Sequence, residues 1–319
     1  MTDLVAIDVG GTHARFALAK IGADGAIALG EPVTLATGDY AGLEEAWVEF
    51  ERATPGPIAH EVAIAAAGPV IDATIPLTNS QWIIDANALR QQLGFERVTL
   101  TNDFGAVAHA VARAPGDQLV HIAGPDRPLP ERGTISVIGP GTGLGVAYIQ
   151  RYPGGCHVQA TEGGHIGFAP QDEFDDGLVT TLREKYARVA TERVNAGPGI
   201  AAIYAALGGT ELADDRAIWQ RGLDRDDQLA AAAIDRFCGS LGTVAGDYAL
   251  VHGASAVVLA GGIGLKLRDL LPRSDFAARF CAKPRYEAMM ANMSVIVLLD
   301  GALTVCGCCC CAVSTSGVK

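Results

Sequence analysis

The stretch AIDVGGTHARFALA, residues 6–19, decides the predicted fold. The apolar run from Leu4 to Asp8 predicts a β-strand, Gly10-Gly11-Thr12 predicts a tight turn, and Phe16 to Ala19 predicts a returning strand. A Gly-Gly turn alone is more often a plain hairpin, but the pattern Asp8-x-Gly10-Gly11-Thr12-x-x-Arg15 is far more specific. Glycines after a strand leave backbone N–H groups open to phosphate oxygens, so this turn is a candidate phosphate site.

A second stretch, SVIGPGTGLGVAYI at residues 136–149, has the same plan about 130 residues later. It predicts a strand, a turn at Gly141-Thr142-Gly143 and a returning strand, so the two stretches form a weak internal repeat. A third glycine pair, Gly261-Gly262, follows the apolar run 255–260 and opens a predicted helix. The N-terminus of such a helix suits a phosphate or the nucleoside beside it.

The order of predicted elements favours an α/β protein. Strands alternate with helices in two similar halves, and residues 175–252 are mostly helical, which predicts two packed lobes with a ligand cleft between them. The sequence contains no G-x-x-x-x-G-K-[ST], which excludes a P-loop enzyme. A dinucleotide site needs its glycines to open a helix, whereas residues 146–149 read as a strand.

Composition and charge restrict the partners. The 319 residues include 49% apolar and 19% charged side chains, an ordinary globular balance. Lys plus Arg number 24 and Asp plus Glu number 36, which gives a formal charge of −12. Because a chain this acidic repels nucleic-acid phosphates and anionic lipids, we expect neither nucleic acid nor a membrane as a partner. A bound nucleotide then needs local backbone dipoles or a metal ion.

The cysteines and the first residues predict a cytoplasmic protein. MTDLVAIDVGG has no basic region followed by a long apolar stretch, as a signal peptide would. Three of the eight cysteines are isolated, at Cys156, Cys238 and Cys281, which fits a reducing compartment. The others are Cys306 and the run 308–311, where adjacent cysteines cannot all face one tetrahedral metal, so no zinc is expected.

Polar residues at strand ends and glycine turns are candidates for binding a sugar. Each sugar hydroxyl needs a donor and an acceptor, and one hydroxyl must lose its proton when it attacks phosphorus. Any one of these residues is by itself more often a surface charge, a helix cap or a core histidine. Because all of them follow strands or adjoin glycine turns, we interpret them together as functional. They are Asn102, Asp103, Glu162, His165 and Glu192.

With these motifs in this order over about 290 residues, the chain resembles the bacterial glucokinases of the hexokinase-like, actin-type ATPase superfamily. The resemblance implies a two-lobed actin-like ATPase (ribonuclease H-like) fold with the active site in the inter-lobe cleft. The motifs that carry it are Asp8-Val9-Gly10-Gly11-Thr12 with Arg15, Leu77-Thr78-Asn79 with Trp82, Asn102-Asp103-Phe104, Gly139 to Gly145, Glu162-Gly163-Gly164-His165, Glu192-Arg193 with Gly197-Pro198-Gly199, and Ala260-Gly261-Gly262.

The resemblance also implies the reaction and the domains. ATP with Mg²⁺ phosphorylates the 6-hydroxyl of D-glucose at the entry to glycolysis, and the usual form is a homodimer. Residues 1–112 would form a small lobe to which 300–319 return, and residues 113–299 would form a large lobe. Two alternatives stay open: a kinase for another hexose, and a catalytically silent ATP- or sugar-binding sensor.

By position, the resemblance assigns a role to each candidate residue, and no protein ligand to a metal. Asp103 would be the base for the 6-hydroxyl. The sugar would be bound by Asn102, Asp103, Glu162, His165 and Glu192. ATP would be bound by Asp8, Gly10, Gly11, Thr12, Gly141, Thr142, Gly143, Gly261 and Gly262, with Gly261-Gly262 on the adenosine side.

Three departures or absences qualify the resemblance. A related group of sugar kinases, which includes transcriptional repressors, carries a zinc-binding cysteine cluster after its Gly-His motif, and residues 166–176 contain no cysteine. Gly167 stands where the family usually has an acid two residues after His165. After Leu299 the family's closing helix is replaced by a cysteine-rich tail, which we expect to weaken packing of the first lobe and to add nothing to the site.

Overall fold

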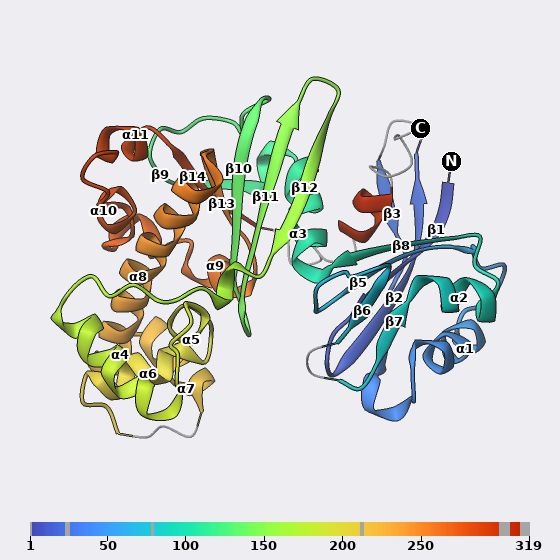
Figure 1. Ribbon diagram of the computed structural model, residues 1–319, viewed down its shortest axis with the longest axis horizontal. Helices are drawn as coiled ribbons and strands as arrows, with labels where there is room; N and C mark the ends of the chain where they lie inside the picture. The colour runs from blue at the N-terminus through green and yellow to red at the C-terminus, as the bar shows by residue number, and fades with distance from the viewer. Residues whose placement is uncertain (1, 23–25, 78–79, 211–213, 300–306, 313–319) are drawn as a thin grey trace. The chain divides into compact units, whose positions relative to one another are not determined.

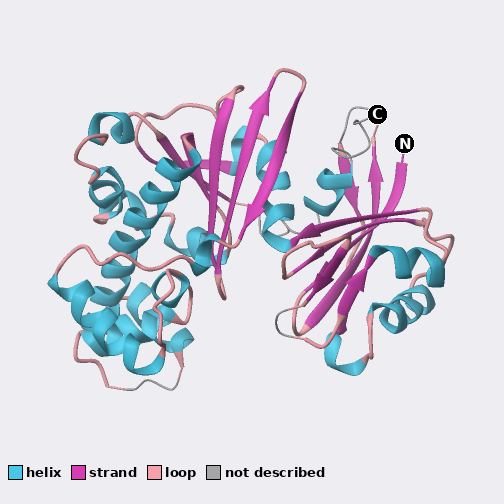
Figure 2. Cartoon of the chain, viewed as in Figure 1, coloured by secondary structure: helices cyan, strands magenta, loops and turns pink. Residues whose placement is uncertain are grey.

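The computed structural model describes residues 2–22, 26–77, 80–210, 214–299 and 307–312 (Figures 1 and 2). By their contacts they form two compact units, one within 1–113, 155–160 and 302–319, and the other within 114–154 and 161–301. The contacts group residues 155–160 with the first unit, although the strand to which they belong pairs within the sheet of the second unit. The Thr78-Asn79 part of the Leu77-Thr78-Asn79 motif lies outside the described residues.

The first unit is built on a six-stranded sheet in the order β3-β2-β1-β5-β8, with β4 also pairing with β2. The central strand β1 is antiparallel to β2 and parallel to β5, which is in turn parallel to β8. The strands are β1 (Thr2–Val9), β2 (His13–Ile21), β3 (Ile27–Leu29), β4 (Val33–Ala36), β5 (Glu61–Ala66) and β8 (Arg97–Asn102).

The two faces of this sheet bury different side chains. Because residues alternate along a strand, Val5 and Ile7 of β1 join Phe16 and the helices α1 and α2 in one core. Leu4 and Ala6 point to the other face, where small residues allow α3 and residues 307–312 to pack closely. The helices are α1 (Leu43–Ala53), α2 (Ala86–Leu93) and α3 (Asp103–Arg113).

A small hairpin and two short 3₁₀ helices complete the described secondary structure of residues 26–118. Helix α2 begins at Ala86, because the Asp85 carboxylate accepts hydrogen bonds from the backbone N–H groups of Asn87 and Ala88 and so caps it. The preceding residues form a strand paired with β6. These elements are β6 (Thr74–Pro76), β7 (Ile83–Asp85), η1 (Thr37–Asp39) and η2 (Gly116–Gln118), the last beyond the first unit.

Residues 307–312 are helical and belong to the core of the first unit. Cys308 and Cys309 are 0% exposed, and the Cys308 thiol donates to the carbonyl of Ile7 in β1 at 3.5 Å. Burial raises the pKa of Cys308 well above its ordinary value, which keeps the thiol protonated. Residues 307–312 therefore pack within the first unit, where Cys308 and Cys309 adjoin small sheet residues such as Ala6 and Ala65.

The second unit repeats the plan of the first. Its six-stranded sheet has the order β12-β11-β10-β13-β14-β9, and β10 is antiparallel to β11 and parallel to β13, which is parallel to β14. Strands β11-β10-β13-β14 therefore have the same order and directions as β2-β1-β5-β8 of the first unit, which confirms the internal repeat. The strands are β9 (Leu119–Ala123), β10 (Gly133–Pro140), β11 (Leu144–Tyr152), β12 (Gly155–Thr161), β13 (Ala254–Leu259) and β14 (Ser294–Leu298).

Helices of the second unit gather around α8 (Figure 1). This helix, Gln228–His252, begins at the capping carboxylate of Asp227 and ends at Gly253 in the left-handed region. No helix within the described ranges is long and apolar enough to cross a bilayer. The other helices are η3 (Gly163–His165), α4 (Glu173–Lys185), α5 (Glu192–Asn195), α6 (Gly199–Ala206), α7 (Asp215–Leu223), α9 (Gly262–Leu267), η4 (Leu271–Arg273), α10 (Phe276–Cys281) and α11 (Glu287–Ala291).

Replacement of Gly307 by alanine tests the packing of residues 307–312. A Cβ at Gly307 would collide with the backbone of Ala106 in α3, so we expect Gly307→Ala to destabilise the protein by about 1–3 kcal/mol, the usual cost of overpacking. Gly177 in α4 is the matched control, because a Cβ there meets nothing within 4 Å. Differential scanning fluorimetry should show a lower Tm for Gly307→Ala and an unchanged or higher one for Gly177→Ala. Equal Tm values for the two variants would contradict this packing.

Candidate active site

The first unit presents a glycine turn between β1 and β2. The backbone N–H of Gly10 donates to the carbonyl of His13 at 2.9 Å, and Thr37 braces the turn from outside by donating to Gly11 and Thr12. Gly10 and Gly11 remain partly exposed and Thr12 is exposed. The turn is therefore held in shape while its outer surface stays accessible.

Asn102 and Asp103 stand at the junction of β8 and α3. Strand register aligns Val9 with Ala66 and Ala66 with Asn102, which brings the end of β8 to the same sheet edge as the glycine turn. Asn102 Oδ1 accepts from the backbone N–H of Phe104 and Gly105 at 2.9 and 3.1 Å, and its Nδ2 donates to Gly68 at 3.0 Å. Asn102 thus caps α3 and fixes Asp103, the first residue of that helix.

Burial raises the pKa of the Asp103 carboxyl above its ordinary value of 3.8, although the N–H of Phe104 donates to it at 2.7 Å and opposes the shift. Burial likewise raises the pKa of Asp8, against the ion pair that Arg15 makes with it at 3.0 Å, and the Asp103 charge adds to that rise. Two carboxyls therefore influence each other beside the glycine turn. A carboxylate with a raised pKa is a stronger proton acceptor than an ordinary aspartate.

The second unit brings Glu162, His165 and Glu192 together. The His165 imidazole lies between the two carboxylates, with Nε2 at 3.7 Å from Glu162 Oε2 and Nδ1 at 3.5 Å from Glu192 Oε1. Glu162 and His165 are exposed, whereas the Glu192 side chain is only 17% exposed. The group offers acceptors and donors in one place, as hydroxyl recognition requires.

Backbone contacts explain why these side chains meet. Tyr248 Oη donates to the carbonyl of Gly163, and the N–H of Thr191 donates to Ile166 at 2.8 Å. A Cβ at Gly164 would collide with the Leu144 carbonyl, so only glycine allows the loop to lie this close to β11. Gly167, which replaces the family's acid, forms an isolated bridge with Ala190 and so ties this loop to the segment before Glu192.

The glycine segments of the second unit converge on one another. The N–H of Gly197 donates to Gly141 at 2.7 Å, and Gly261 packs against the backbone of Gly139 and Pro140. A Cβ at Gly143 would lie 3.2 Å from Glu192 Oε2. The Gly141-Thr142-Gly143 turn therefore adjoins both the Gly261-Gly262 segment and the polar group that contains Glu192.

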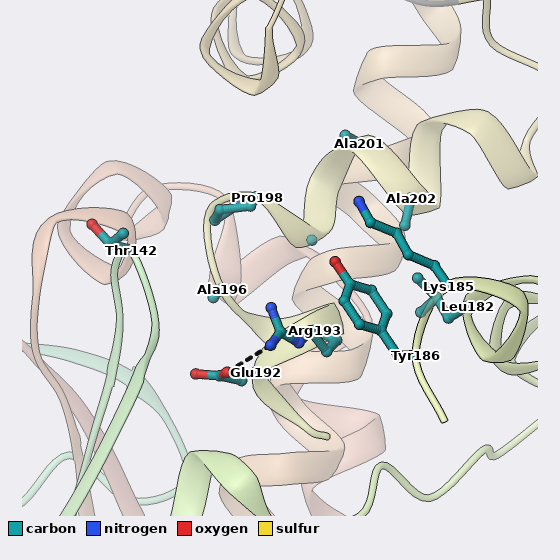
Figure 3. A pocket seen from close by; sticks show the side chains of 11 residues that line it. Thr142, Leu182, Lys185, Tyr186, Glu192, Arg193, Ala196, Pro198, Ala201 and Ala202 are labelled. Carbon is teal, nitrogen blue, oxygen red and sulfur yellow. Dashed lines mark ion pairs between the residues drawn. The ribbon is translucent and has the colours of Figure 1, made fainter. Parts of the chain in front are cut away.

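A cavity of about 320 Å³ opens beside this turn (Figure 3). Sequence reasoning missed two of its side chains, Lys185 and Tyr186, because they end a surface helix without any motif; Arg193 was noted only as a neighbour of Glu192. Arg193 Nη2 lies 3.8 Å from Glu192 Oε1. The lining residues are Thr142, Leu182, Lys185, Tyr186, Glu192, Arg193, Ala196, Pro198, Gly199, Ala201 and Ala202.

The predicted site residues thus fall into two groups, each within one unit. Within the described ranges, no group of three or more His, Cys, Asp or Glu side chains could hold a metal ion. The first unit carries Asp8, Gly10, Gly11, Thr12, Asn102 and Asp103. The second carries Gly141, Thr142, Gly143, Glu162, His165, Glu192, Gly261 and Gly262.

Known proteins share both the sequence and the fold. Residues 4–315 match the glucokinase family. The chain is 46% identical over 298 residues to a glucokinase of Zymomonas mobilis subsp. mobilis, covering 92% of each chain. The crystal structure of a glucokinase from an Antarctic psychrotroph has 29% identity and a TM-score of 0.84 over 98% of both chains. A ROK family glucokinase from Streptomyces griseus, in complex with glucose and AMPPNP, has 22% identity and a TM-score of 0.60 over 99% of this chain and all of that one.

These likenesses confirm the predicted two-lobed actin-like ATPase fold. The match spans almost the whole chain and includes both glycine turns and both polar groups described above. Sequence and fold therefore agree, and the chain belongs to the glucokinase family.

Proposed function

We propose that this protein transfers the γ-phosphoryl group of ATP to the 6-hydroxyl of D-glucose, with Asp103 as the general base. One observation carries the proposal: Asp103 is a carboxyl with a burial-raised pKa, fixed by the Asn102 cap at the sheet edge where the Gly10-Gly11-Thr12 turn presents its backbone. The family membership and the glucose and AMPPNP in the Streptomyces griseus structure support this reading.

The chemical step requires little covalent work from the protein. Asp103 accepts the proton of the sugar 6-hydroxyl as that oxygen forms a bond to the γ-phosphorus, and the bond to the bridging oxygen breaks to release ADP. Charge spreads over the phosphoryl oxygens in the transition state, so rigid donors around them lower the barrier. Backbone N–H groups of the two glycine turns would serve as such donors.

The non-reacting hydroxyls of glucose would be held by Glu162, His165, Glu192 and Asn102. Carboxylates accept hydrogen bonds from hydroxyls, and the imidazole can donate or accept according to its tautomer. The nucleotide, as its Mg²⁺ complex, would contact Asp8, Gly10, Gly11, Thr12 and Gly141 to Gly143, with Gly261 and Gly262 on the adenosine side. The proposal places the enzyme in the cytoplasm, as a homodimer of the kind usual in the family.

A coupled assay with glucose, ATP and Mg²⁺ tests the reaction directly. We expect glucose-dependent ADP release that stops when Mg²⁺ is chelated, because no P-loop lysine is present to neutralise the transferring phosphate. Circular dichroism of the chelated sample should be unchanged. Binding of glucose or ATP without turnover would instead identify a silent sensor, and faster turnover of another hexose would reassign the substrate.

Two carboxylate substitutions separate the base from a sugar ligand. Asp103→Asn keeps an acceptor for the N–H of Phe104 but cannot take a proton, so kcat should fall about 10²- to 10⁴-fold with glucose still bound. Glu162→Gln should chiefly raise KM for glucose, because it weakens binding in ground and transition states alike. Steady-state kinetics together with glucose titrations of both variants provide the measurement. Retention of more than about a tenth of kcat in Asp103→Asn would show that another group is the base.

The raised pKa of Asp103 also predicts opposite trends in activity and stability. The base works only when ionised, so kcat/KM should fall as the pH drops through a pKa above 3.8. The folded pKa is raised, so the protonated carboxyl favours folding, and that contribution is lost as pH rises through the folded pKa. Asp103→Asn should therefore have an equal or higher Tm than wild type at pH 7, with the gap closing toward pH 4. A markedly lower Tm at pH 7 would disagree with this ionisation.

A further inference from the structure

Two cationic side chains that have no role in the proposed reaction line the cavity beside Thr142. Lys185 ends α4 and Arg193 lies in α5, and both line the same cavity of about 320 Å³. Apart from them and Glu192, the wall is uncharged, and much of it consists of Ala, Pro and Gly. The lining residues therefore sum to one positive charge in a chain of formal charge −12. Local positive charge in an acidic protein favours an anionic ligand.

Tyr186 fixes the direction of both cations. Arg193 Cζ lies 4.5 Å from the centre of the Tyr186 ring and Lys185 Nζ lies 5.3 Å from it. In Figure 3 the ring lies between the two side chains. Such cation–π contacts limit the motion of flexible side chains, so less freedom is lost when a ligand binds. The Arg193 guanidinium is also tethered to Glu192 at 3.8 Å.

The position of the cavity indicates which anion it accepts. Thr142, at the centre of the glycine turn assigned to phosphate, forms part of the cavity wall, and so does Gly199. Gly199 belongs to the Gly197-Pro198-Gly199 turn, which is joined to the phosphate turn by the hydrogen bond from the Gly197 N–H to Gly141. Glu192, on the same wall, faces His165 of the proposed sugar group. A ligand here would thus lie between the phosphate turn and the sugar-binding side chains of the same unit. The volume falls within the range of small-molecule sites.

We propose that Lys185 and Arg193 bind the phosphate oxygens of the donor nucleotide as it lies against Thr142, and so supply local positive charge in a chain whose net charge is negative. This inference rests on the proposed kinase function and adds two residues to it. Arginine can contact two phosphate oxygens with its planar fork, while the lysine ammonium acts as a point charge. The ligand class is a nucleoside di- or triphosphate, recognised by its phosphates rather than by its base.

Binding measurements without turnover test the assignment. Isothermal titrations with ADP, adenosine and inorganic tripolyphosphate should compare wild type with Arg193→Gln and Lys185→Gln. Each variant should bind ADP and tripolyphosphate about 10-fold more weakly, because one charge-assisted contact is lost, and should bind adenosine as wild type does. Arg193→Lys should recover part of the loss. Arg183→Gln is the matched control, since Arg183 belongs to the same helix as Lys185 but does not line the cavity, and it should change ADP affinity less than about twofold.

Two outcomes would overturn the inference. The first is an ADP affinity within about twofold of wild type in both Arg193→Gln and Lys185→Gln. The second is a loss of adenosine affinity as large as the loss of ADP affinity, which would mean that the substitution disturbs binding of the base or the fold rather than a phosphate contact. Glucose-dependent turnover of wild type is measured separately. If wild type turns over glucose and both variants bind ADP as wild type does, the two phosphate contacts are rejected and the kinase function stands. If the variants bind ADP more weakly but wild type shows no turnover, the kinase function is rejected and the contacts stand.

Discussion

The pairing of one central strand in each unit determines where the glycine turns and the Asn102-Asp103 pair lie. β1 and β10 each have an antiparallel neighbour joined by a glycine turn and a parallel neighbour on the other side. Because parallel strands end at the same sheet edge, the turn and the ends of the parallel strands meet there. In the first unit this edge joins Gly10 to Asn102, and in the second it joins Gly141 to Gly261.

In the second unit, the Glu192 side chain lies beside residues of both the proposed sugar group and the glycine turn. Its Oε1 atom lies 3.5 Å from His165 Nδ1 and 3.8 Å from Arg193 Nη2, and the carboxylate adjoins the Gly143 backbone. Since the side chain is largely buried, its charge is poorly screened, and the Arg193 guanidinium 3.8 Å away compensates it. One carboxylate thus connects the proposed sugar residues with the cavity proposed for phosphate.

Much of this arrangement can be predicted from sequence, because glycine turns after apolar runs are local signals. The repeat of residues 6–19 in 136–149, the strand ending at Asn102 and the family all follow from such patterns. Lys185 and Tyr186 do not, since a cation and an aromatic ring at a helix end have many ordinary uses. Strand β7 is also not predictable from local signals, because its register with β6 is a tertiary pairing.

The helix at 307–312 has a consequence for the order in which the protein folds. The hydrogen bond from Cys308 to Ile7 joins residues 301 positions apart, and the core around Ala6 and Ala106 is closed by that helix. During synthesis, the strands that are made first therefore remain with part of one apolar face open to water until residues 307–312 are made. Domains generally fold as their residues emerge, so the second unit, although translated later, can complete its core first. The first unit then finishes last, and its exposed face is the surface on which chaperones and aggregation compete in the meantime.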